Sequence, residues 1–237
     1  MSRSPELSVI LPCYNESRGL QAILDRYAHV GAGENFELIL VDNGSTDDTP
    51  RVLERLLKDY KFARSVRVEI NQGYGHGLYT GLQAAEGELL CWSHADMQTD
   101  PGDVFRALSI YRRSPDPTRT LIKGQRFGRR WSEQFVSWSM QTLSSLFFWM
   151  RMYEINAQPK LFHRDLLVYL TRPPKDFNFD VYVLYKAKRH GWRVEAFPVK
   201  FPPRQYGVSN WAATWRSKVR TMRRSMFYML RLSLADE

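Results

Sequence analysis

The stretch WSHADMQTDP, residues 92–101, places polar side chains that could do chemistry directly after an apolar run. His94, Asp96 and Gln98 occupy every second position, so on an extended segment their side chains point to the same side. Carboxylate and amide oxygens suit Mg²⁺ or Mn²⁺, whereas imidazole better suits softer ions. The spacing therefore predicts a divalent-cation site that would bridge phosphates. The final TDP has a simpler interpretation as the start of a helix.

Similar polar clusters follow each strand that we expect in the first half of the chain. The strands are expected at 7–11, 36–41, 66–70 and 88–93, and the clusters after them read PCYNES, DNGSTDD, NQGYGHG and HADMQTD. Amphipathic helices are expected between the strands. This alternation predicts an α/β fold with a mostly parallel central sheet flanked by helices. Ligands bind such sheets beyond the carboxyl ends of the strands, so the four loops are expected to share one binding edge.

The glycine-rich cluster NQGYGHGLYTG, residues 71–81, is open to two interpretations. It has some likeness to a dinucleotide-binding fingerprint, but that motif follows the first strand of a sheet and this cluster follows the third. A tight turn from strand to helix is the interpretation that we favour.

The second half of the chain has a less regular pattern. Strands are expected at 120–127, 158–162 and 192–201, and helices at 135–153, 178–190 and 209–232. No linker, repeat or low-complexity segment interrupts the sequence. Residues 1–237 are therefore predicted to form a single domain.

Composition limits the class of protein. Of the 237 residues, 43% are hydrophobic and 25% are charged, which is typical of a globular chain. No apolar run reaches the roughly 18 residues that a transmembrane helix needs, and the N-terminus lacks the pattern of a signal peptide. Cys13 and Cys91 lie in or beside apolar runs. They are expected to be buried free thiols, which indicates a reducing compartment and a cytoplasmic location.

The formal net charge of +9 favours an anionic partner, and much of this charge lies near the C-terminus. From Arg204 to Arg231 there are seven basic residues and no acidic ones, interleaved with aromatic and methionine residues. Such a helix can lie in a membrane interface with its arginines against anionic headgroups. It can equally pack on the core with its basic face in solvent. Nucleic-acid binding is disfavoured because no known module is present and the loops at the binding edge are rich in carboxylates.

Three motifs together resemble those of glycosyltransferase family 2, whose members have the GT-A fold. They are LSVILPCYNE at 7–16, LILVDNGSTDDT at 38–49 and HADMQTDP at 94–101, with weaker matches in KGQR at 123–126 and RQYGVS at 204–209. The pattern is most similar to that of the polyprenyl-phosphate (dolichyl-phosphate) sugar synthases. The resemblance implies transfer of a sugar, with inversion at the anomeric carbon, from a nucleoside diphosphate sugar. It also implies Mg²⁺ or Mn²⁺, and an acceptor that is polyprenyl phosphate or another cell-envelope glycan precursor.

The resemblance further implies roles for individual residues. The set expected to bind the nucleotide sugar comprises Pro12, Tyr14, Glu16, Val41, Asn43, Ala95, Asp96, Arg126 and Arg204. The set expected to hold the metal comprises Asp96, Gln98 and His94. Val41 and Asn43 would border the base, and the two arginines would hold phosphate, because the planar fork of a guanidinium suits phosphate oxygens. Residues 1–100 would form a nucleotide-binding half, 101–208 an acceptor-side half, and 209–237 a basic amphipathic helix at the inner face of the membrane.

Three positions depart from the family's usual pattern. His94 and Asn43 stand where aspartate is common, and Asn210 replaces a basic residue. His94 is therefore either a direct metal ligand or a residue that contacts the phosphate or supports the ligands. An amide at position 43 can still read the edge of a base.

A general base is harder to identify than the metal site. An alcohol acceptor needs one, whereas a lipid phosphate, already ionised, does not. The relatives carry an aspartate in the acceptor-side motif that corresponds to INAQPKLF, residues 155–162, but Asn156 and Gln158 cannot act as bases. Asp180 joins Asp96 and Arg126 as a candidate catalytic residue, in the role of base. Its alternative role is that of an acidic residue in the first turn of a helix, where the helix dipole favours it.

Two other functions stay open at this point. A non-catalytic module that binds nucleotides or lipids would follow if the change at His94 marks a decayed metal site. A nucleotidyltransferase would need a loop rich in glycine and basic residues after the first strand, and PCYNESRG is a poor match.

Overall fold

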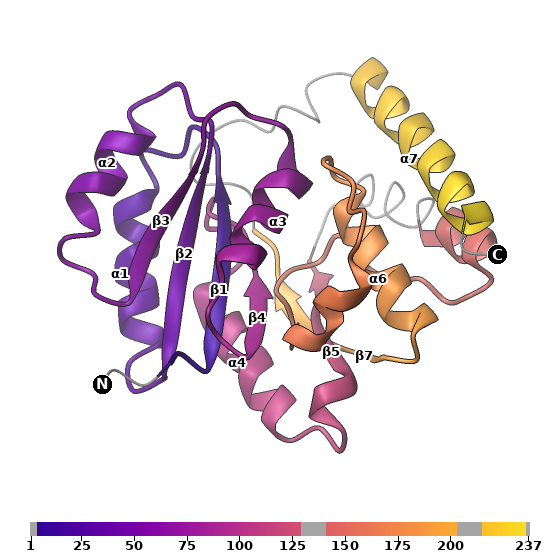
Figure 1. Cartoon of the computed structure of the whole chain (residues 1–237), viewed down its shortest axis with the longest axis horizontal. Coiled ribbons are helices and arrows are strands. Elements are labelled where there is room, and N and C mark those ends of the chain that lie inside the picture. Colours follow the sequence, from indigo (N-terminus) through magenta and orange to yellow (C-terminus); the bar gives the residue numbers. More distant parts are fainter. Residues whose placement is uncertain (1–3, 129–140, 203–214, 236–237) are drawn as a thin grey trace.

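The computed structural model describes residues 4–128, 141–202 and 215–235, and one seven-stranded sheet lies at its centre (Figure 1). The strands are β1 (Leu7–Cys13), β2 (Phe36–Asn43), β3 (Ala63–Val68), β4 (Leu89–Trp92), β5 (Thr120–Phe127), β6 (Lys160–His163) and β7 (Arg193–Lys200). Their order across the sheet is β3-β2-β1-β4-β6-β5-β7. Neighbouring strands are parallel except at β6, which is antiparallel to both β4 and β5. The mostly parallel sheet predicted from the sequence is confirmed.

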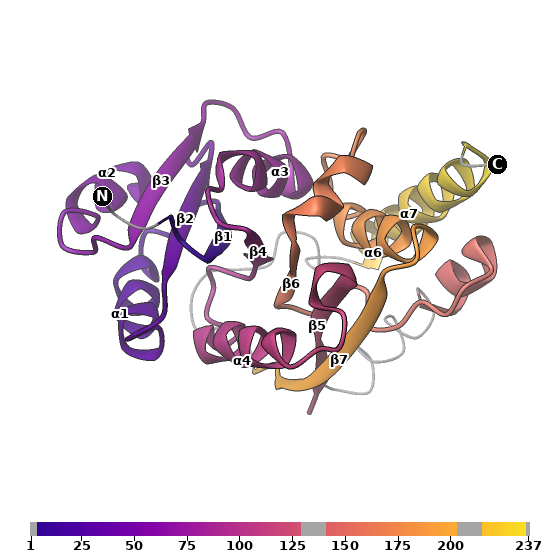
Figure 2. The same cartoon turned by 60° about the horizontal axis from the view of Figure 1, so that its bottom comes forward.

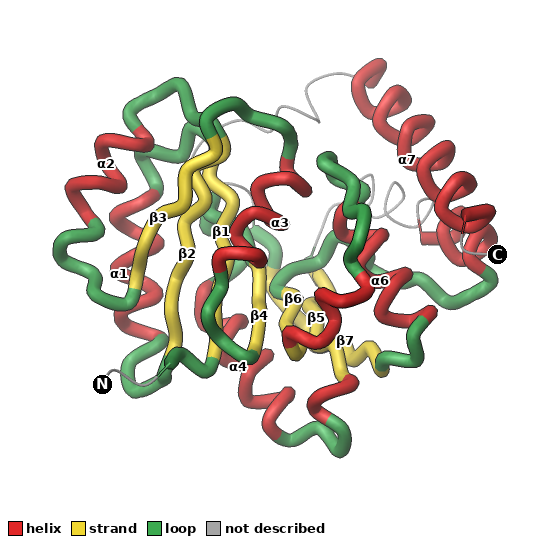
Figure 3. Tube along the Cα trace, in the orientation of Figure 1, coloured by secondary structure: helices red, strands yellow, loops and turns green. Residues whose placement is uncertain are grey.

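Helices cover both faces of this sheet (Figures 2 and 3). They are α1 (Leu20–Val30), α2 (Thr49–Leu56), α3 (Tyr74–Ala84), α4 (Pro101–Arg112), α6 (Phe179–Arg189) and α7 (Trp215–Ala235), with short 3₁₀ turns at Pro117–Arg119 and Arg164–Tyr169. The apolar faces of α1, α2 and α4 pack in one core on one side of the sheet. Those of α3 and α6 pack in a second core on the other side, which Met229 of α7 joins. The residues that would bind a ligand thus stand at the edge of a rigid two-sided scaffold.

The start of α4 explains the TDP that ends the opening motif. The Asp100 carboxylate accepts a hydrogen bond of 2.8 Å from the Gly102 amide and pairs with Arg26 of α1 at 3.0 Å. Because a cap residue satisfies a backbone amide that the helix leaves unpaired, this aspartate fixes where the helix begins. The structure assigns the cap to Asp100, the aspartate of this TDP sequence.

Two helices differ from the sequence prediction. The helix expected at 135–153 ends at 148, while residues 129–140 lie outside the described residues. Trp149 and Glu154 have positive φ angles of 51° and 42°, so the chain turns away from the helical path there. The C-terminal helix continues to Ala235, and the part expected at 209–214 lies outside the described residues.

Cys13 and Cys91 are buried free thiols, as expected, and burial raises the pKa of each. None of the helices in the described ranges combines the length and the apolar composition that crossing a membrane requires.

Candidate active site

Hydrogen bonds join the first two loops at the carboxyl edge of the sheet. The Asn15 amide N–H donates to Ser45 Oγ at 3.0 Å, and Asn15 Oδ1 accepts from the Thr46 amide at 2.9 Å. The Glu16 amide donates to Thr49 Oγ1 at 3.0 Å. Asn15 has a φ of 58°, a conformation that asparagine tolerates better than most residues. Sequence analysis missed this junction, since one amide in a polar loop has no distinctive pattern.

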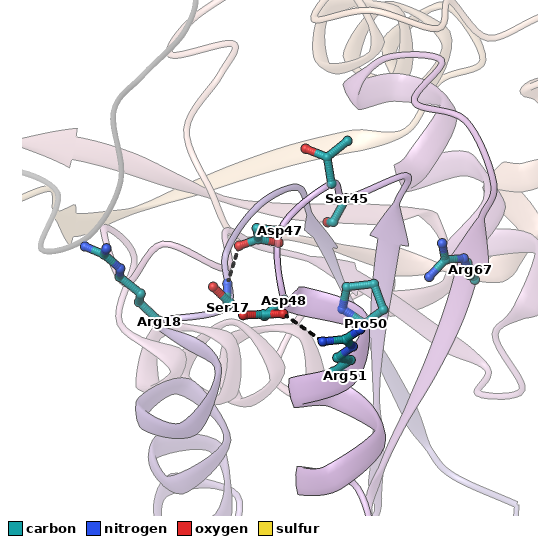
Figure 4. Close-up of a pocket in the computed structure, with 9 residues that line it drawn as sticks. Ser17, Arg18, Ser45, Asp47, Asp48, Pro50, Arg51 and Arg67 are labelled. Atoms are coloured by element: carbon teal, nitrogen blue, oxygen red, sulfur yellow. Dashed lines mark hydrogen bonds and ion pairs between the residues drawn. The ribbon is translucent and has the colours of Figure 1, made fainter.

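An open pocket of about 840 Å³ lies between these two loops and β3 (Figure 4). Its wall is formed by Ser17, Arg18, Ser45, Thr46, Asp47, Asp48, Pro50, Arg51 and Arg67. Charges on this wall are partly paired, because Arg67 contacts the buried Asp42 at 3.2 Å and Arg51 contacts Asp48 at 3.7 Å. Residues 94–98 do not line this pocket.

The residues expected to border the nucleotide divide into exposed and buried ones. Tyr14 is exposed, and Pro12 and Glu16 are half-buried beside it. Val41 is fully buried in the core. Asn43 is also buried, and its Nδ2 donates to the Gly73 carbonyl at 3.0 Å. Among the described residues, Asn43 Oδ1 has no hydrogen-bond partner, so this amide offers one oriented acceptor at the end of β2.

The glycine-rich cluster is a turn that lets α3 lie against another loop. Gly73 has a φ of +111°, and a Cβ built on it would lie 2.4 Å from the Lys175 carbonyl oxygen. A Cβ on Gly75 would lie 2.3 Å from the Pro174 carbonyl oxygen. These distances exclude any larger residue, so the cluster serves close packing of backbone on backbone. The Tyr74 ring stacks on Phe177 of the same loop, with ring centroids 5.2 Å apart.

The opening motif lies at the end of β4, where Asp96 is 3% exposed. Asp96 Oδ1 accepts from the Gln98 amide N–H at 3.0 Å, while Gln98 Nε2 donates to the Pro202 carbonyl at 3.1 Å. Ala95 is buried between His94 and Asp96. Burial lowers the pKa of His94, although Asp96 and Asp180 act in the opposite direction, so the imidazole is neutral near pH 7. Neutral imidazole is the form that can bind a metal or accept a hydrogen bond.

This donor set fits a cation that shares its ligands with a phosphate. The described ranges contain no group of three or more His, Cys, Asp or Glu side chains that could hold a metal ion. Mg²⁺ is commonly held by one or two carboxylates together with substrate phosphates, rather than by a cage of protein groups. Asp96 can supply the carboxylate, and the oriented Gln98 amide and His94 lie next to it in the sequence.

Arg126 of β5 is tied to a partner that sequence analysis missed. Its Nε donates to Glu154 Oε2 at 2.9 Å, and the guanidinium lies 5.3 Å from the centroid of the Phe201 ring. The same Phe201 ring packs edge-on against His94, with centroids 6.4 Å apart. The Phe201 ring therefore contacts both His94 of the expected metal-binding stretch and Arg126, the arginine expected to bind phosphate. Arg204 and Asn210 lie outside the described residues.

Two lysines are buried beside the motif, on neighbouring strands. Lys123 of β5 lies opposite Lys160 of β6, which in turn lies opposite Trp92 of β4. The Lys160 ammonium pairs with Asp180, the first-turn residue of α6. Burial lowers the pKa of Lys123 to about 7, and the positive charge of Lys160 contributes to this shift. Burial also lowers the pKa of Lys160, although Asp180 raises it.

Asp180 accepts several hydrogen bonds within this cluster. Besides the Lys160 ammonium, its Oδ1 accepts from Trp92 Nε1 at 3.3 Å and from Gln158 Nε2 at 3.0 Å. Of its two expected roles, its position in the first turn of α6 matches the helix-terminal one, and its role as a general base stays a prediction. The two lysines were missed, although a lysine inside each of two short apolar strands was the available signal.

Comparison with known proteins finds relatives that are similar to this chain in sequence. A relative from Mycobacterium tuberculosis, described as an uncharacterised glycosyltransferase, is 28% identical over 222 residues, which are 90% of this chain and 93% of the relative. The dodecaprenyl-phosphate galacturonate synthase of Rhizobium johnstonii is 27% identical over 172 residues, 70% of this chain and 50% of that protein.

A solved structure extends the likeness of fold across nearly the whole chain. The glucosyl-3-phosphoglycerate synthase of Mycobacterium tuberculosis, crystallised with Mn²⁺, UDP-glucose and phosphoglyceric acid, superimposes with a TM-score of 0.74 at 18% identity. The match covers 97% of this chain and 79% of that one. The sequence model of the family described as Glycosyl transferase family 2 matches residues 8–169. This chain therefore belongs to glycosyltransferase family 2.

Proposed function

We propose that this chain transfers a sugar, with inversion, from a nucleoside diphosphate sugar to a lipid phosphate of the polyprenyl type. The observation that carries the proposal is the buried Asp96 at the end of β4, on the edge where the polar loops of a family 2 fold converge. We assign residues 1–100 to the nucleotide and 101–208 to the acceptor within one domain.

The donor part of the proposal rests on charge. The leaving group is a nucleoside diphosphate, and negative charge grows on it as the bond to the sugar breaks. Asp96, with Gln98 and His94, would hold Mg²⁺ or Mn²⁺, which supplies positive charge to the diphosphate when bound. Arg126 would orient the phosphate through its guanidinium, which Glu154 and Phe201 already hold in place. The complex of the mycobacterial synthase with Mn²⁺ and UDP-glucose supports the same ligand class here.

The acceptor part rests on the engagement of Asp180. A carboxylate that accepts from a buried ammonium, an indole and an amide is poorly suited to take a proton from an alcohol. An ionised phosphate needs no such base. The Rhizobium johnstonii relative, described as a dodecaprenyl-phosphate galacturonate synthase, supports a phosphate acceptor on a polyprenyl chain. We therefore assign Asp180 to positioning and not to proton transfer.

The membrane part rests on an exposed apolar surface. A groove of about 410 Å³ lies between residues 146–150, α6 and α7, and four exposed apolar side chains line it: Leu146, Trp149, Leu230 and Leu234. The exposed Phe227 comes three residues before Leu230 on α7, which puts the two side chains on the same face of that helix. Trp149 is 91% exposed. Exposed arginines lie on α7, at positions 220, 223, 224 and 231. Apolar side chains beside basic ones suit the surface of an anionic membrane, so we propose peripheral contact there, on the cytoplasmic face.

The test of the reaction is a panel of nucleotide sugars with Mn²⁺ or Mg²⁺, with and without polyprenyl phosphate, in which nucleoside diphosphate release is measured. Release should depend on both the metal and the lipid phosphate. Asp96→Ala should abolish it, while Asp59→Ala, which removes an exposed carboxylate of the turn after α2, should leave it intact. Nucleotide binding without turnover of any donor would instead identify a binding module.

The test of the membrane contact is co-sedimentation with vesicles that contain anionic phospholipid. The double variant Trp149→Ser and Phe227→Ser should bind more weakly than the unaltered protein, and high salt should weaken both. Val168→Ser is the matched control, because Val168 is an exposed apolar residue outside the groove. Equal binding by all three proteins would remove this surface from the proposal.

A further inference from the structure

We infer that the side-chain oxygen of Gln158 binds a hydroxyl group of the transferred sugar and so selects the donor. The inference rests on the proposed function, because it requires a sugar donor at this edge of the sheet. It gives a specific role to Gln158, which lies two residues before the start of β6.

The sheet and its hydrogen bonds place Gln158 close to the end of β4, which leads into residues 94–98. In the antiparallel pair of β4 and β6, Trp92 lies opposite Lys160, and Gln158 comes two residues before Lys160. The Trp92 indole N–H and the Gln158 amide both donate to Asp180 Oδ1, at 3.3 Å and 3.0 Å. On its other side Gln158 meets β5, since a Cβ built on Gly124 would lie 2.1 Å from the Gln158 carbonyl oxygen. Gln158 therefore lies between the end of β4 and the KGQR segment that carries Arg126.

The contacts of Gln158 fix which way its amide faces. Its Nε2 lies 3.0 Å from Asp180 Oδ1 and 3.2 Å from the Tyr74 hydroxyl. Asp180 Oδ1 already accepts from the Lys160 ammonium and the Trp92 indole N–H, so Asp180 acts as a hydrogen-bond acceptor here. Because a carboxylate only accepts, the amide nitrogen has to face Asp180, and the amide oxygen Oε1 has to face away from it.

The oxygen that results is buried and unmatched. Gln158 is 1% exposed, and no described residue donates a hydrogen bond to Oε1. A buried acceptor without a donor is unfavourable, so this position favours a ligand that brings a donor. An ionised phosphate oxygen cannot do so, whereas a sugar hydroxyl can. The contact would be enclosed, which is the setting in which loss of one hydrogen bond discriminates most between ligands.

The experiment measures how the enzyme responds to removal of single hydroxyl groups. The probes are UDP-glucose and GDP-mannose, each with its 2-, 3-, 4- and 6-deoxy forms, and the readouts are kcat/KM and, for binding without acceptor, calorimetry. With the unaltered protein, one deoxy form should lose about 10- to 100-fold in kcat/KM or affinity. Gln158→Met keeps the length of the side chain but removes the amide oxygen. The variant should lose a similar factor in kcat/KM or affinity for the parent donor, and it should show the same kcat/KM or affinity for the parent donor and the deoxy form.

Controls separate this role from a structural one. Gln125→Met changes a neighbouring glutamine whose amide donates to the Tyr153 hydroxyl at 2.7 Å, and it should keep full discrimination. UDP and GDP without sugar should bind the Gln158→Met protein as tightly as the unaltered one.

Two results would overturn the inference: an unaltered protein that distinguishes no deoxy form by more than about threefold, or a Gln158→Met protein that keeps the original discrimination. The first result tests the inference even if the Gln158→Met protein does not fold, because it is measured on the unaltered protein. Failure of the proposed function is a separate outcome, since the unaltered protein would then neither bind nor turn over any sugar donor.

Discussion

Replacing Asp180 with asparagine leaves a buried positive charge without its partner. The substitution keeps the shape of the side chain but removes the negative charge opposite Lys160, and both side chains are almost completely buried, at 3% and 0% exposure. The amide oxygen of asparagine can still accept from Trp92 and Gln158, but without a negative charge it attracts the Lys160 ammonium less than a carboxylate does.

The expected loss of folding stability follows from the burial of both charged side chains. Removing one partner of a buried ion pair costs about 3–5 kcal/mol, whereas an exposed pair contributes about 0–1 kcal/mol. In a chain of 237 residues each kcal/mol lowers the melting temperature by roughly 2–4 °C, so a fall of about 6–20 °C is expected.

The loss should also shrink as pH rises. Asp180 raises the pKa of Lys160, so without it the pKa of Lys160 falls further below its ordinary value. At higher pH the lysine of the variant then releases its proton and the unmatched charge disappears.

The assay is thermal and urea unfolding at pH 6.5 and pH 9, with Asp165→Asn as control. Asp165 pairs with His163 at 3.0 Å but is 69% exposed, so its loss should change stability by less than about 1 kcal/mol. A double variant, Asp180→Leu with Lys160→Met, should recover much of the loss because it removes both charges. The reasoning is refuted if the free energy of unfolding of Asp180→Asn lies within about 1 kcal/mol of that of the unaltered protein, or if the double variant is no more stable than the single one.

Three further predictions follow from single contacts. The pKa of Lys123 is about 7 in the folded protein against an ordinary 10.5, so the unfolded chain binds the extra proton between these values and stability rises with pH there. Lys123→Met should remove about 2 kcal/mol of the gain between pH 6.5 and 8.5 seen in urea unfolding, and an unchanged gain would contradict it. Asn43 Oδ1 is an acceptor that an N–H group of a base can meet, so calorimetry should find that Asn43→Leu binds UDP and GDP more weakly than the unaltered protein does; equal affinities would contradict this role. Gly75→Ala should lower stability by about 1–3 kcal/mol in urea unfolding, because its methyl group meets the Pro174 carbonyl, whereas a neutral result would mean that the loop yields.

The helices and strands of the first half could be predicted from the sequence because each has a short local pattern. Apolar runs, helical spacing and the polar clusters after them locate β1, β2 and β4, and with them Asp96, since these signals span fewer than about ten residues. The C-terminal limit of the helix near 148 was missed because aromatic residues continue past it while two positive φ angles redirect the chain.

The supporting residues of the site could not be read in the same way. Glu154 and Arg126 are 28 positions apart, and Lys160 and Asp180 are 20 apart, so only the folded sheet brings each pair together. Phe201 gives no signal at all in the sequence, because an aromatic residue at the end of a strand is ordinary. The free oxygens of Asn43 and Gln158 depend on which atom of an amide faces a neighbour, and that is a property of three-dimensional contacts alone.

The contact between α3 and the loop at 174–176 constrains evolution on one side only. The glycines at 73 and 75 have to remain, since a side chain at either would meet a carbonyl oxygen. The opposing surface is backbone, and every amino acid provides the same carbonyl group. A substitution at 174–176 therefore leaves the carbonyl groups that face the two glycines unchanged, although Lys175 and Asp176 have side-chain contacts of their own with Gln72 and Arg224. A search for correlated substitutions across relatives would overlook this junction, although it joins residues about 100 positions apart in the chain.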